Sequence, residues 1–387
     1  MRNTDVLIVG GGLAGSLAAA MLGRRGISAI LVDPHEIYPR ELRCEKLDAG
    51  QIAILRRTGV ADVVLERSVR ADILWVARMD RLVDKKPGLQ HGIMYESLVN
   101  AIRGEIGGSV AFERGKVDSI TTSDERQNVV LASGEVISAR LVVLANGLNL
   151  ALRESLGLTR RILSPTHSVT IGFDVAPASG QRFAFDGLTY YAARPEDRWA
   201  YLTLFPVPGA MRGNLMVYRD MTDPWLARMR KTPLEAMGEL MPRLHDIAGR
   251  LTVSSEVWVR PADLYQTEGV ERPGIVLVGD AFATSCPAAG TGSGKVFTDV
   301  ERLCNEHLPR WLETPGMSAD KIASFYADPE KQAYDRYARE LAFSLKATSV
   351  GRAPHWAARR WGKFFARAGI GALRRLRTSP GAFPEAA

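Results

Sequence analysis

Residues 6–33 read VLIVGGGLAGSLAAAMLGRRGISAILVD. An apolar run leads into a glycine-rich turn, a helical pattern follows, and a second apolar run ends on Asp33. Gly10 allows a tight turn, Gly12 allows the backbone to approach a pyrophosphate, and Gly15 allows the helix to pack closely on the strand. The pyrophosphate would lie at the helix N-terminus, where unpaired N–H groups and the helix dipole stabilise its charge, and Asp33 would bind the adenosine ribose. The stretch therefore predicts a dinucleotide-binding βαβ unit, whose candidate cofactor-binding residues are Gly10, Gly12, Leu13, Ala14, Gly15 and Asp33.

The dinucleotide fingerprint of residues 6–33 does not distinguish an FAD site from an NAD(P) site, but a second segment does. Residues 274–303 read GIVLVGDAFATSCPAAGTGSGKVFTDVERL, which predicts a buried strand, a Gly279-Asp280 turn, a loop with Pro287, and a helix from about Ser293. Together the two segments resemble the class A flavoprotein monooxygenases, the family that includes para-hydroxybenzoate hydroxylase. In that family a GD motif followed by PxxGxG marks the second half of the FAD site. Asp280 could instead be an ordinary turn cap.

The resemblance implies a role for each motif residue. Asp280, after Gly279, would bind the ribitol of FAD, and the backbone of Gly290, Thr291 and Gly292 would face the pyrimidine side of the flavin. A helix N-terminus suits that position, because reduced flavin carries negative charge near N1 and C2=O. Pro287 would form the wall at the reacting flavin edge and is the candidate catalytic residue. Two further cofactor-binding candidates are implied, Arg43 over the FAD phosphates and Val117 beside the adenine.

The implied activity is hydroxylation of a small aromatic or hydrophobic molecule. NADH or NADPH would reduce the flavin, O₂ would form a flavin C4a-hydroperoxide, and this species would transfer hydroxyl to the substrate. The alternative enzyme is an FAD-dependent reductase or dehydrogenase of the geranylgeranyl reductase type, acting on a lipid-like substrate. A non-enzymatic alternative is a flavin-bound adaptor. Lys46 resembles the catalytic lysine of flavin-dependent halogenases, but the WxWxIP signature of those enzymes is missing, so Lys46 is interpreted as structural or phosphate-facing. No metal site is expected.

One motif departs from the family pattern. After the predicted strand 141–145 the chain reads Asn146-Gly147, with Arg153 downstream, where class A enzymes usually carry Asp-Gly and an arginine. An amide still donates and accepts hydrogen bonds but carries no charge. The departure puts the usual docking of NAD(P)H in doubt, and Asn-Gly can also be a simple turn. His91 and His167 are expected to be structural, so no catalytic base is evident.

The predicted fold class is α/β with α+β elements: a Rossmann-like FAD-binding domain, an inserted antiparallel-sheet substrate domain, and C-terminal helices. The aromatic side chains of the inserted region suit an aromatic substrate, although aromatic residues at strand spacing are more often core. A single helix is expected over 224–240. The expected segments are 1–70, 95–160 and 266–315 for the FAD domain, 71–94 and 161–265 for the substrate lobe, and 316–387 for the C-terminal helices.

Composition is typical of a compact enzyme. The 387 residues include three cysteines, Cys44, Cys286 and Cys304, whose odd number and spacing argue against a disulfide framework or a metal cluster. No apolar stretch reaches the ~18 residues of a membrane span, and the N-terminal apolar run lacks a cleavage pattern. A cytoplasmic location is expected, with a small molecule and O₂ as partners.

The net charge of +7 belongs to the tail, because residues 351–377 contain eight Lys or Arg and no Asp or Glu. A helical projection places Arg360, Lys363, Arg367 and Arg374 opposite an apolar side that consists of Trp361, Phe364, Phe365, Ala368, Ala372 and Leu376. The tail could lie peripherally on the inner, anionic membrane surface. The slightly favoured alternative is that it docks its aromatic side on the body and leaves its arginines in water. Gly369 and Gly371 argue against one straight helix, and no nucleic-acid module accompanies the charge.

Overall fold

The computed structural model describes residues 2–41 and 43–378, and for 376–378 it describes the backbone alone. The chain forms two compact units. Unit 1 comprises Met1–Val69, His91–His167 and Ala262–Ala342, and unit 2 comprises Arg70–Gln90, Ser168–Pro261 and Phe343–Ala387. The chain passes between the units five times. Four of these crossings lie within the strands β4 (Val69–Arg78), β5 (Arg81–Met94), β10 (Thr159–Pro177) and β15 (Trp258–Glu268), and the fifth lies within the helix α12 (Pro329–Val350).

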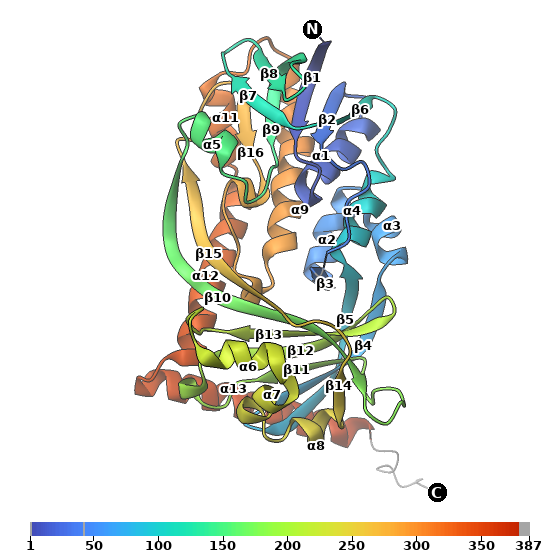
Figure 1. Ribbon diagram of the computed structural model, residues 1–387, viewed down its shortest axis with the longest axis vertical. Coiled ribbons are helices and arrows are strands. Elements are labelled where there is room, and N and C mark those ends of the chain that lie inside the picture. Colours follow the sequence, from blue (N-terminus) through green and yellow to red (C-terminus); the bar gives the residue numbers. More distant parts are fainter. Residues whose placement is uncertain (1, 42, 379–387) are drawn as a thin grey trace, which may run out of the picture. The chain divides into compact units, whose positions relative to one another are not determined.

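Unit 1 is built on a mainly parallel sheet in the order β6-β2-β1-β9-β8-β7, with β16 also paired to β9 (Figure 1). The strands β6, β2, β1, β9 and β16 run parallel, whereas β8 and β7 form an antiparallel extension. Near-continuous apolar runs suit strands that are covered on both faces. The strands are β1 (Arg2–Val9), β2 (Ala29–Asp33), β6 (Val110–Arg114), β7 (Val117–Thr121), β8 (Gln127–Leu131), β9 (Val136–Leu144) and β16 (Ile275–Leu277).

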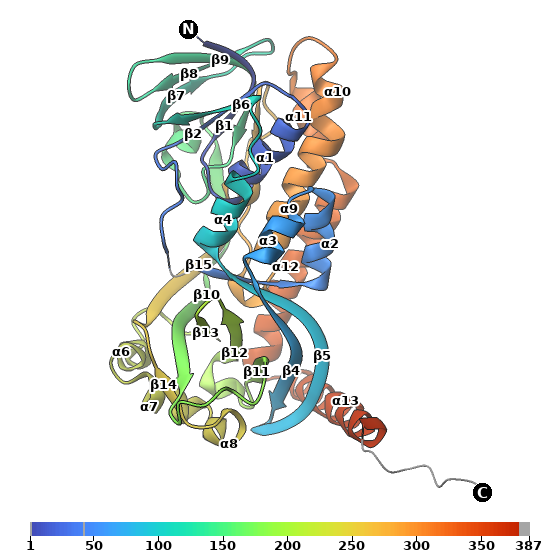
Figure 2. The same ribbon diagram turned by 90° about the vertical axis from the view of Figure 1, so that its right-hand side faces the viewer.

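Helices flank this sheet, and α1 and α9 lie side by side against it (Figures 1 and 2). The other elements of unit 1 are a short strand, several helices, two 3-10 turns and a π-helical turn. They are α1 (Leu13–Arg24), β3 (Cys44–Asp48), α2 (Ala49–Arg57), α3 (Ala61–Glu66), α4 (Tyr95–Arg103), α5 (Ala151–Ser155), η2 (Gly279–Ala281), η3 (Pro287–Ala289), α9 (Gly292–Arg302), η4 (Leu303–His307), α10 (Leu308–Leu312), α11 (Ala319–Tyr326) and the first part of α12 (Pro329–Val350).

Unit 2 contains a mixed sheet in the order β14-β10-β13-β12-β11-β4-β5. One face of it packs against three helices, and the aromatic side chains of Phe173, Tyr190 and Trp199 are fully buried in that core, as their strand spacing predicts. The elements are β4 (Val69–Arg78), β11 (Gly187–Tyr191), η1 (Pro195–Asp197), β12 (Trp199–Val207), β13 (Ala210–Val217), α6 (Pro224–Lys231), α7 (Pro233–Leu240), α8 (Leu244–Ala248), β14 (Leu251–Val253) and α13 (Pro354–Thr378). The predicted α/β class, with a Rossmann-like unit, a second sheet and C-terminal helices, is confirmed. The second sheet was predicted to be antiparallel, and its pairs β10–β13, β10–β14, β11–β12 and β12–β13 are, but β11 and β4 pair in parallel.

The helix expected over 224–240 is in fact two helices, α6 and α7. Thr232 takes φ −132° and ψ 67° between them. The residue before a proline is driven out of the helical region, and Pro233 has no N–H to continue the ladder. Because proline is well tolerated at the first position of a helix, the second helix restarts at Pro233.

The tail also differs from the expectation. Residues 354–378 form one helix, α13, despite Gly369 and Gly371. The docked side carries Arg367 and Arg374, which bind the buried Asp84 of β5, whereas Trp361 and Phe365 face outward. This is the reverse of the favoured interpretation. The side chains of Leu376 and Arg377 lie outside the described part of the chain. Within residues 2–41 and 43–378, no helix combines the length and the apolar character that a bilayer span requires.

Candidate cofactor-binding site

The turn after β1 has the conformation that its glycines predict. Gly10 adopts φ +97° and donates its N–H to the Val32 carbonyl at 2.9 Å. A methyl group added at Gly15 would lie 1.8 Å from the Gly10 carbonyl oxygen, so this glycine is required by packing. Gly12 is different, because an added methyl group would have its nearest neighbour, the Tyr95 hydroxyl, at 3.8 Å. The backbone in front of α1 is therefore open at Gly12.

Asp33 lies at the end of β2, as expected, and helps to build the turn. Its Oδ2 accepts the Gly11 N–H at 2.7 Å, and its Oδ1 accepts the His35 N–H at 2.9 Å. Arg103, on α4, lies 3.4 Å from the same carboxylate and donates to the carbonyls of Gly11 and Glu36. Arg103 was missed by sequence reasoning, because an arginine in the last turn of a helix is an ordinary feature.

The GD motif lies directly against the fingerprint helix. Gly279 adopts φ +61° after β16, and a methyl group added to it would lie 3.5 Å from the Ala14 side chain. The Gly279 N–H is accepted by Asp299 Oδ2 of α9 at 2.9 Å, which fixes the direction of the turn. Two motifs far apart in sequence are thus adjacent at the starts of α1 and α9.

The loop before α9 presents open backbone. Gly290 adopts φ +67°, and no described atom lies within 4 Å of a methyl group added there. Thr291 is buried, yet among the described residues its hydroxyl has no hydrogen-bond partner. Gln51 of α2 holds the loop, since its Nε2 donates to the Gly290 carbonyl at 3.0 Å and to Ser293 Oγ at 2.9 Å. Sequence reasoning missed Gln51.

Arg43 stands beside the start of α1. Its guanidinium lies 4.1 Å from the centre of the Tyr95 ring, and Tyr95 Oη accepts the N–H of Leu13 at 3.3 Å. Arg43 Nε donates to Glu45 at 3.1 Å. Burial alone would lower the pKa of Arg43, but Tyr95, Glu45 and Asp280 outweigh it and raise this pKa. Burial also raises the pKa of Glu45.

The Asn146-Gly147 turn is tied to the GD turn through Arg153. Arg153 is buried and donates to the Gly147 carbonyl at 3.2 Å and to the Ala281 carbonyl at 2.8 Å. Asn146 Oδ1 is buried with no hydrogen-bond partner among the described residues. Val117 begins β7, three residues after Arg114, which pairs with Asp33.

A largely buried charge cluster links α9 to α12. We call Lys295, Asp299, Lys331 and Asp335 the α9–α12 quartet. Each lysine Nζ lies within 3.1 Å of both carboxylates. Burial disfavours the charge of Asp299, but Lys295 and Lys331 outweigh it and hold the pKa of this carboxyl below its usual range. The quartet therefore fixes the carboxylate that binds the Gly279 N–H.

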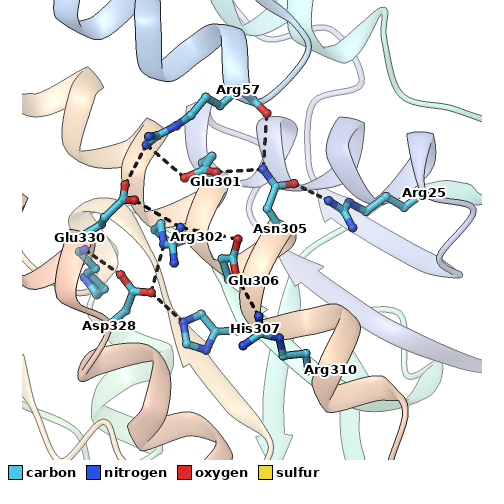
Figure 3. A network of polar contacts seen from close by, with 11 residues as sticks. Arg25, Arg57, Glu301, Arg302, Asn305, Glu306, His307, Arg310, Asp328 and Glu330 are labelled. Carbon is cyan, nitrogen blue, oxygen red and sulfur yellow. Dashed lines mark hydrogen bonds and ion pairs between the residues drawn. The ribbon is translucent and has the colours of Figure 1, made fainter.

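A polar network anchors the far end of α9 and the π-helical turn η4 (Figure 3). Asp328 accepts from Arg302 at 3.0 Å and lies 3.1 Å from His307. Arg57 of α2 binds both Glu301 and Glu330, at 3.3 and 3.1 Å. With the quartet at one end and this network at the other, α9 is held at both ends.

These features fit FAD. The fit rests on the open backbone at Gly12 and Gly290, on the unpartnered hydroxyl of Thr291, and on the cationic Arg43 next to the start of α1. Helix N-termini with accessible backbone suit a pyrophosphate and an anionic flavin ring. A parallel sheet in which a fingerprint and a GD turn meet defines a two-motif flavoprotein.

Comparison with known proteins identifies the family. Residues 3–306 match the family model described as FAD binding domain, so the chain belongs to this family and to the class A FAD-dependent monooxygenases. The protein is an FAD-dependent oxidoreductase that uses NADH or NADPH as electron donor and acts on a small molecule with O₂.

Two relatives match over most of their length. 3-Demethoxyubiquinol 3-hydroxylase of Escherichia coli (strain K12) is 24% identical over 323 residues, which cover 78% of each chain. 6-Hydroxynicotinate 3-monooxygenase of Pseudomonas fluorescens is 24% identical over 338 residues, covering 78% of this chain and 82% of that protein. Among solved structures, p-nitrophenol 4-monooxygenase PnpA of Pseudomonas putida DLL-E4 superposes with a TM-score of 0.77 at 17% identity, covering 96% of this chain and 95% of that one.

Proposed function

We propose that this protein hydroxylates a small aromatic or hydrophobic molecule. The observation that carries the proposal is the meeting of the fingerprint and the GD turn at two helix N-termini with open backbone. Bound FAD supplies hydride acceptance and oxygen activation, so the side chains of the protein need to bind, orient and exclude water.

We propose the following roles for the chain. The N-terminus of α1, from Gly10 to Gly15 with Leu13 and Ala14, holds the pyrophosphate together with Arg43. Asp33 binds the ribose and Val117 the adenine. Gly279 and Asp280 hold the ribitol, the backbone of Gly290–Gly292 faces the pyrimidine, and Pro287 forms the wall beside the substrate.

We propose a positioning role for Arg153 instead of nucleotide binding. Its guanidinium is already committed to the carbonyls of Gly147, Asn149 and Ala281. A cation with this many internal partners would have to break hydrogen bonds to bind NAD(P)H, and a buried donor left without a partner costs about 1–3 kcal/mol.

The test of the hydroxylase function uses ¹⁸O₂. FAD-loaded protein is supplied with NADH or NADPH and a panel of phenols, pyridines and quinols, and products are analysed by mass spectrometry. We expect one labelled oxygen atom in a product, with one NAD(P)H consumed for each product molecule. Reduction of a carbon–carbon double bond without label would favour the reductase alternative.

We propose in addition that α13 contacts a membrane surface. Its outward face exposes Trp361 (49%), Phe365 (64%), Ile370 (46%) and Leu373 (61%). Exposed alanines and glycines fill the rest of this face, and Arg359 and Lys363 stand at its border. An apolar helix face bordered by cations is typical of helices that lie in the interface of an anionic bilayer.

Vesicle flotation tests this contact. We expect the full-length protein to float with anionic vesicles and the variant Trp361→Ser/Phe365→Ser to remain in the unbound fraction. If the same variant instead converts a dimer to a monomer in light scattering, without any vesicle binding by the parent protein, the face is an interface between two copies and the membrane proposal is wrong.

A further inference from the structure

Unit 2 gathers an excess of positive charge where α13 meets the β4–β5 hairpin (Figure 2). We call this group the basic cluster. Its cations interact with one another or with the same carboxylate, that of Asp84, and it consists of Arg78, Lys86, Lys363, Arg367 and Arg374.

Asp84 is the anchor of the basic cluster. It has no exposed surface, and its two oxygens accept from Arg374 at 2.6 Å and from Arg367 at 3.3 Å. Gly371 allows this approach, because a methyl group there would lie 2.1 Å from the Val83 carbonyl oxygen. The two arginines are therefore held firmly against β5, although they belong to a terminal helix.

Among the described residues, the other three cations of the cluster form no direct ion pair with a carboxylate, although Asp84 attracts Lys86 through space. The Arg78 guanidinium stacks on the Tyr191 ring at 3.6 Å, and among the described residues its buried Nε has no hydrogen-bond partner. Lys86 and Lys363 make no ion pair within the described part of the chain. Each carries a lowered pKa: burial is the main cause for both, with Arg367 next for Lys86 and Arg359 next for Lys363.

Such an arrangement favours an anion. Partly buried like charges repel one another, and the repulsion and desolvation are relieved when an anion binds among them. A donor without a partner, such as Arg78 Nε, also gains a hydrogen bond from an incoming oxygen. Guanidinium groups match the geometry of phosphate oxygens particularly well.

The position of the cluster indicates where the anion comes from. On α13, Lys363, Arg367 and Arg374 follow the border of the outward face that carries Phe365 and Ile370. When an amphipathic helix inserts its apolar face at the headgroup level, side chains at the border of that face lie at the depth of the lipid phosphates.

We propose that the basic cluster binds the phosphate of an anionic phospholipid headgroup. This inference rests on the membrane contact proposed for α13 and makes it specific for anionic lipid. The hydroxylase activity on a dissolved substrate does not depend on it.

The experiment compares vesicles of phosphatidylcholine alone with vesicles that also contain phosphatidylglycerol, using the FAD-loaded full-length protein. The test variants are Arg78→Met and Lys363→Met. Arg230→Met is the matched control, because it removes the same charge from an exposed position of α6 in the same unit. We expect each test variant to weaken binding to the anionic vesicles about fivefold, at about 1 kcal/mol for each lost cation, and the control to bind like the parent.

The outcomes separate the two proposals. Equal binding to both kinds of vesicle, or equal weakening by the Arg230→Met control, overturns the phosphate site but leaves the membrane contact. Absence of binding to either kind overturns both. If inorganic phosphate or NADPH raises the melting temperature of the parent, but not that of Arg78→Met, while vesicles do not bind, the ligand is a soluble phosphate and the lipid assignment is wrong.

Discussion

Two glycines of the fingerprint differ in what surrounds them, and substitution separates their roles. In Gly15→Ala the new methyl group overlaps the Gly10 carbonyl, so we expect the free energy of unfolding to fall by about 1–3 kcal/mol or more. In Gly12→Ala the methyl group fits the protein but would occupy the space expected for the pyrophosphate. We expect a nearly unchanged melting temperature for the apoprotein and FAD binding at least about tenfold weaker.

Thermal melts of the apoprotein and fluorescence titration with FAD measure the two effects. Equal FAD affinity of Gly12→Ala and the parent would contradict the assignment of this surface to the cofactor.

A second prediction at the scale of one residue concerns Cys304. Burial raises the pKa of its thiol to about 12. At pH 8 roughly one thiol in ten thousand is then ionised, and only the thiolate reacts. We expect Cys304 to resist iodoacetamide in the native protein and to react once urea unfolds it, as followed by peptide mass spectrometry.

The same shift has a consequence for stability. The folded pKa lies above the unfolded one, so the protonated thiol favours the folded state below the unfolded pKa, and this contribution is lost as the pH rises toward 12. Cys304→Ser should remove that part of the alkaline destabilisation.

At the scale of elements, α13 offers a matched pair of glycines. Gly369 has open space around it, whereas Gly371 touches β5. Alanine is the better helix former by about 1 kcal/mol. We therefore expect Gly369→Ala to stabilise the protein by up to that amount and Gly371→Ala to destabilise it by displacing α13 from Val83. Urea denaturation measures both, and stabilisation by Gly371→Ala would show that α13 is not docked in this way.

The α9–α12 quartet gives a further element-scale prediction. Lys331→Met leaves the buried carboxylate of Asp299 and the half-buried one of Asp335 with one lysine, and breaking a buried ion pair costs about 3–5 kcal/mol. We expect a loss of this size in the free energy of unfolding, together with weaker FAD retention, because Asp299 orients Gly279. Lys116→Met, at an exposed site of the same unit, is the control. A loss no larger than that of the control would mean that the quartet does not support the turn.

An element could be predicted from the sequence where the residues that determine it are close together in the chain. The βαβ fingerprint, the GD strand and turn, and the helix that begins at Tyr95 are encoded by local patterns of glycines and apolar residues. The break at Pro233 is local too, but a run of helix-forming residues on both sides masked it. The contacts of Arg103, Gln51 and the quartet could not be predicted, because they join residues that are distant in sequence. A single polar or charged residue on a helix gives no local pattern from which its partner can be identified.

The predicted orientation of α13 was wrong for a related reason. The helical projection correctly separates an apolar from a basic side, but amphipathicity does not say which side docks. The orientation of α13 is determined by Asp84, a single acidic residue in a strand that is distant in sequence, and by the close approach of Gly371 to that strand.

At the scale of the whole molecule, α13 combines a structural role with the membrane contact proposed above, and a deletion cannot separate the two. Removing residues 351–387 takes Arg367 and Arg374 away from Asp84 and leaves its carboxylate without these partners. We expect the truncated protein to show faster hydrogen exchange in β5, lower thermal stability of unit 2, and FAD binding retained through the motifs of unit 1. Truncation that leaves exchange in β5 unchanged would contradict a structural role for α13. Point variants on the outward face of α13 test membrane binding more specifically, because they leave the contacts of Asp84 in place.

Each unit is assembled from three separate stretches of chain, and the two FAD motifs of unit 1 lie in the first and the last of them. During synthesis on the ribosome, the fingerprint emerges early but must wait for residues 262–342 before its neighbouring turn and α9 exist. The apolar strand β9 likewise lacks its partner β16 until then. We therefore expect the nascent chain to remain exposed to aggregation until most of it has been made, and FAD to bind late and complete folding.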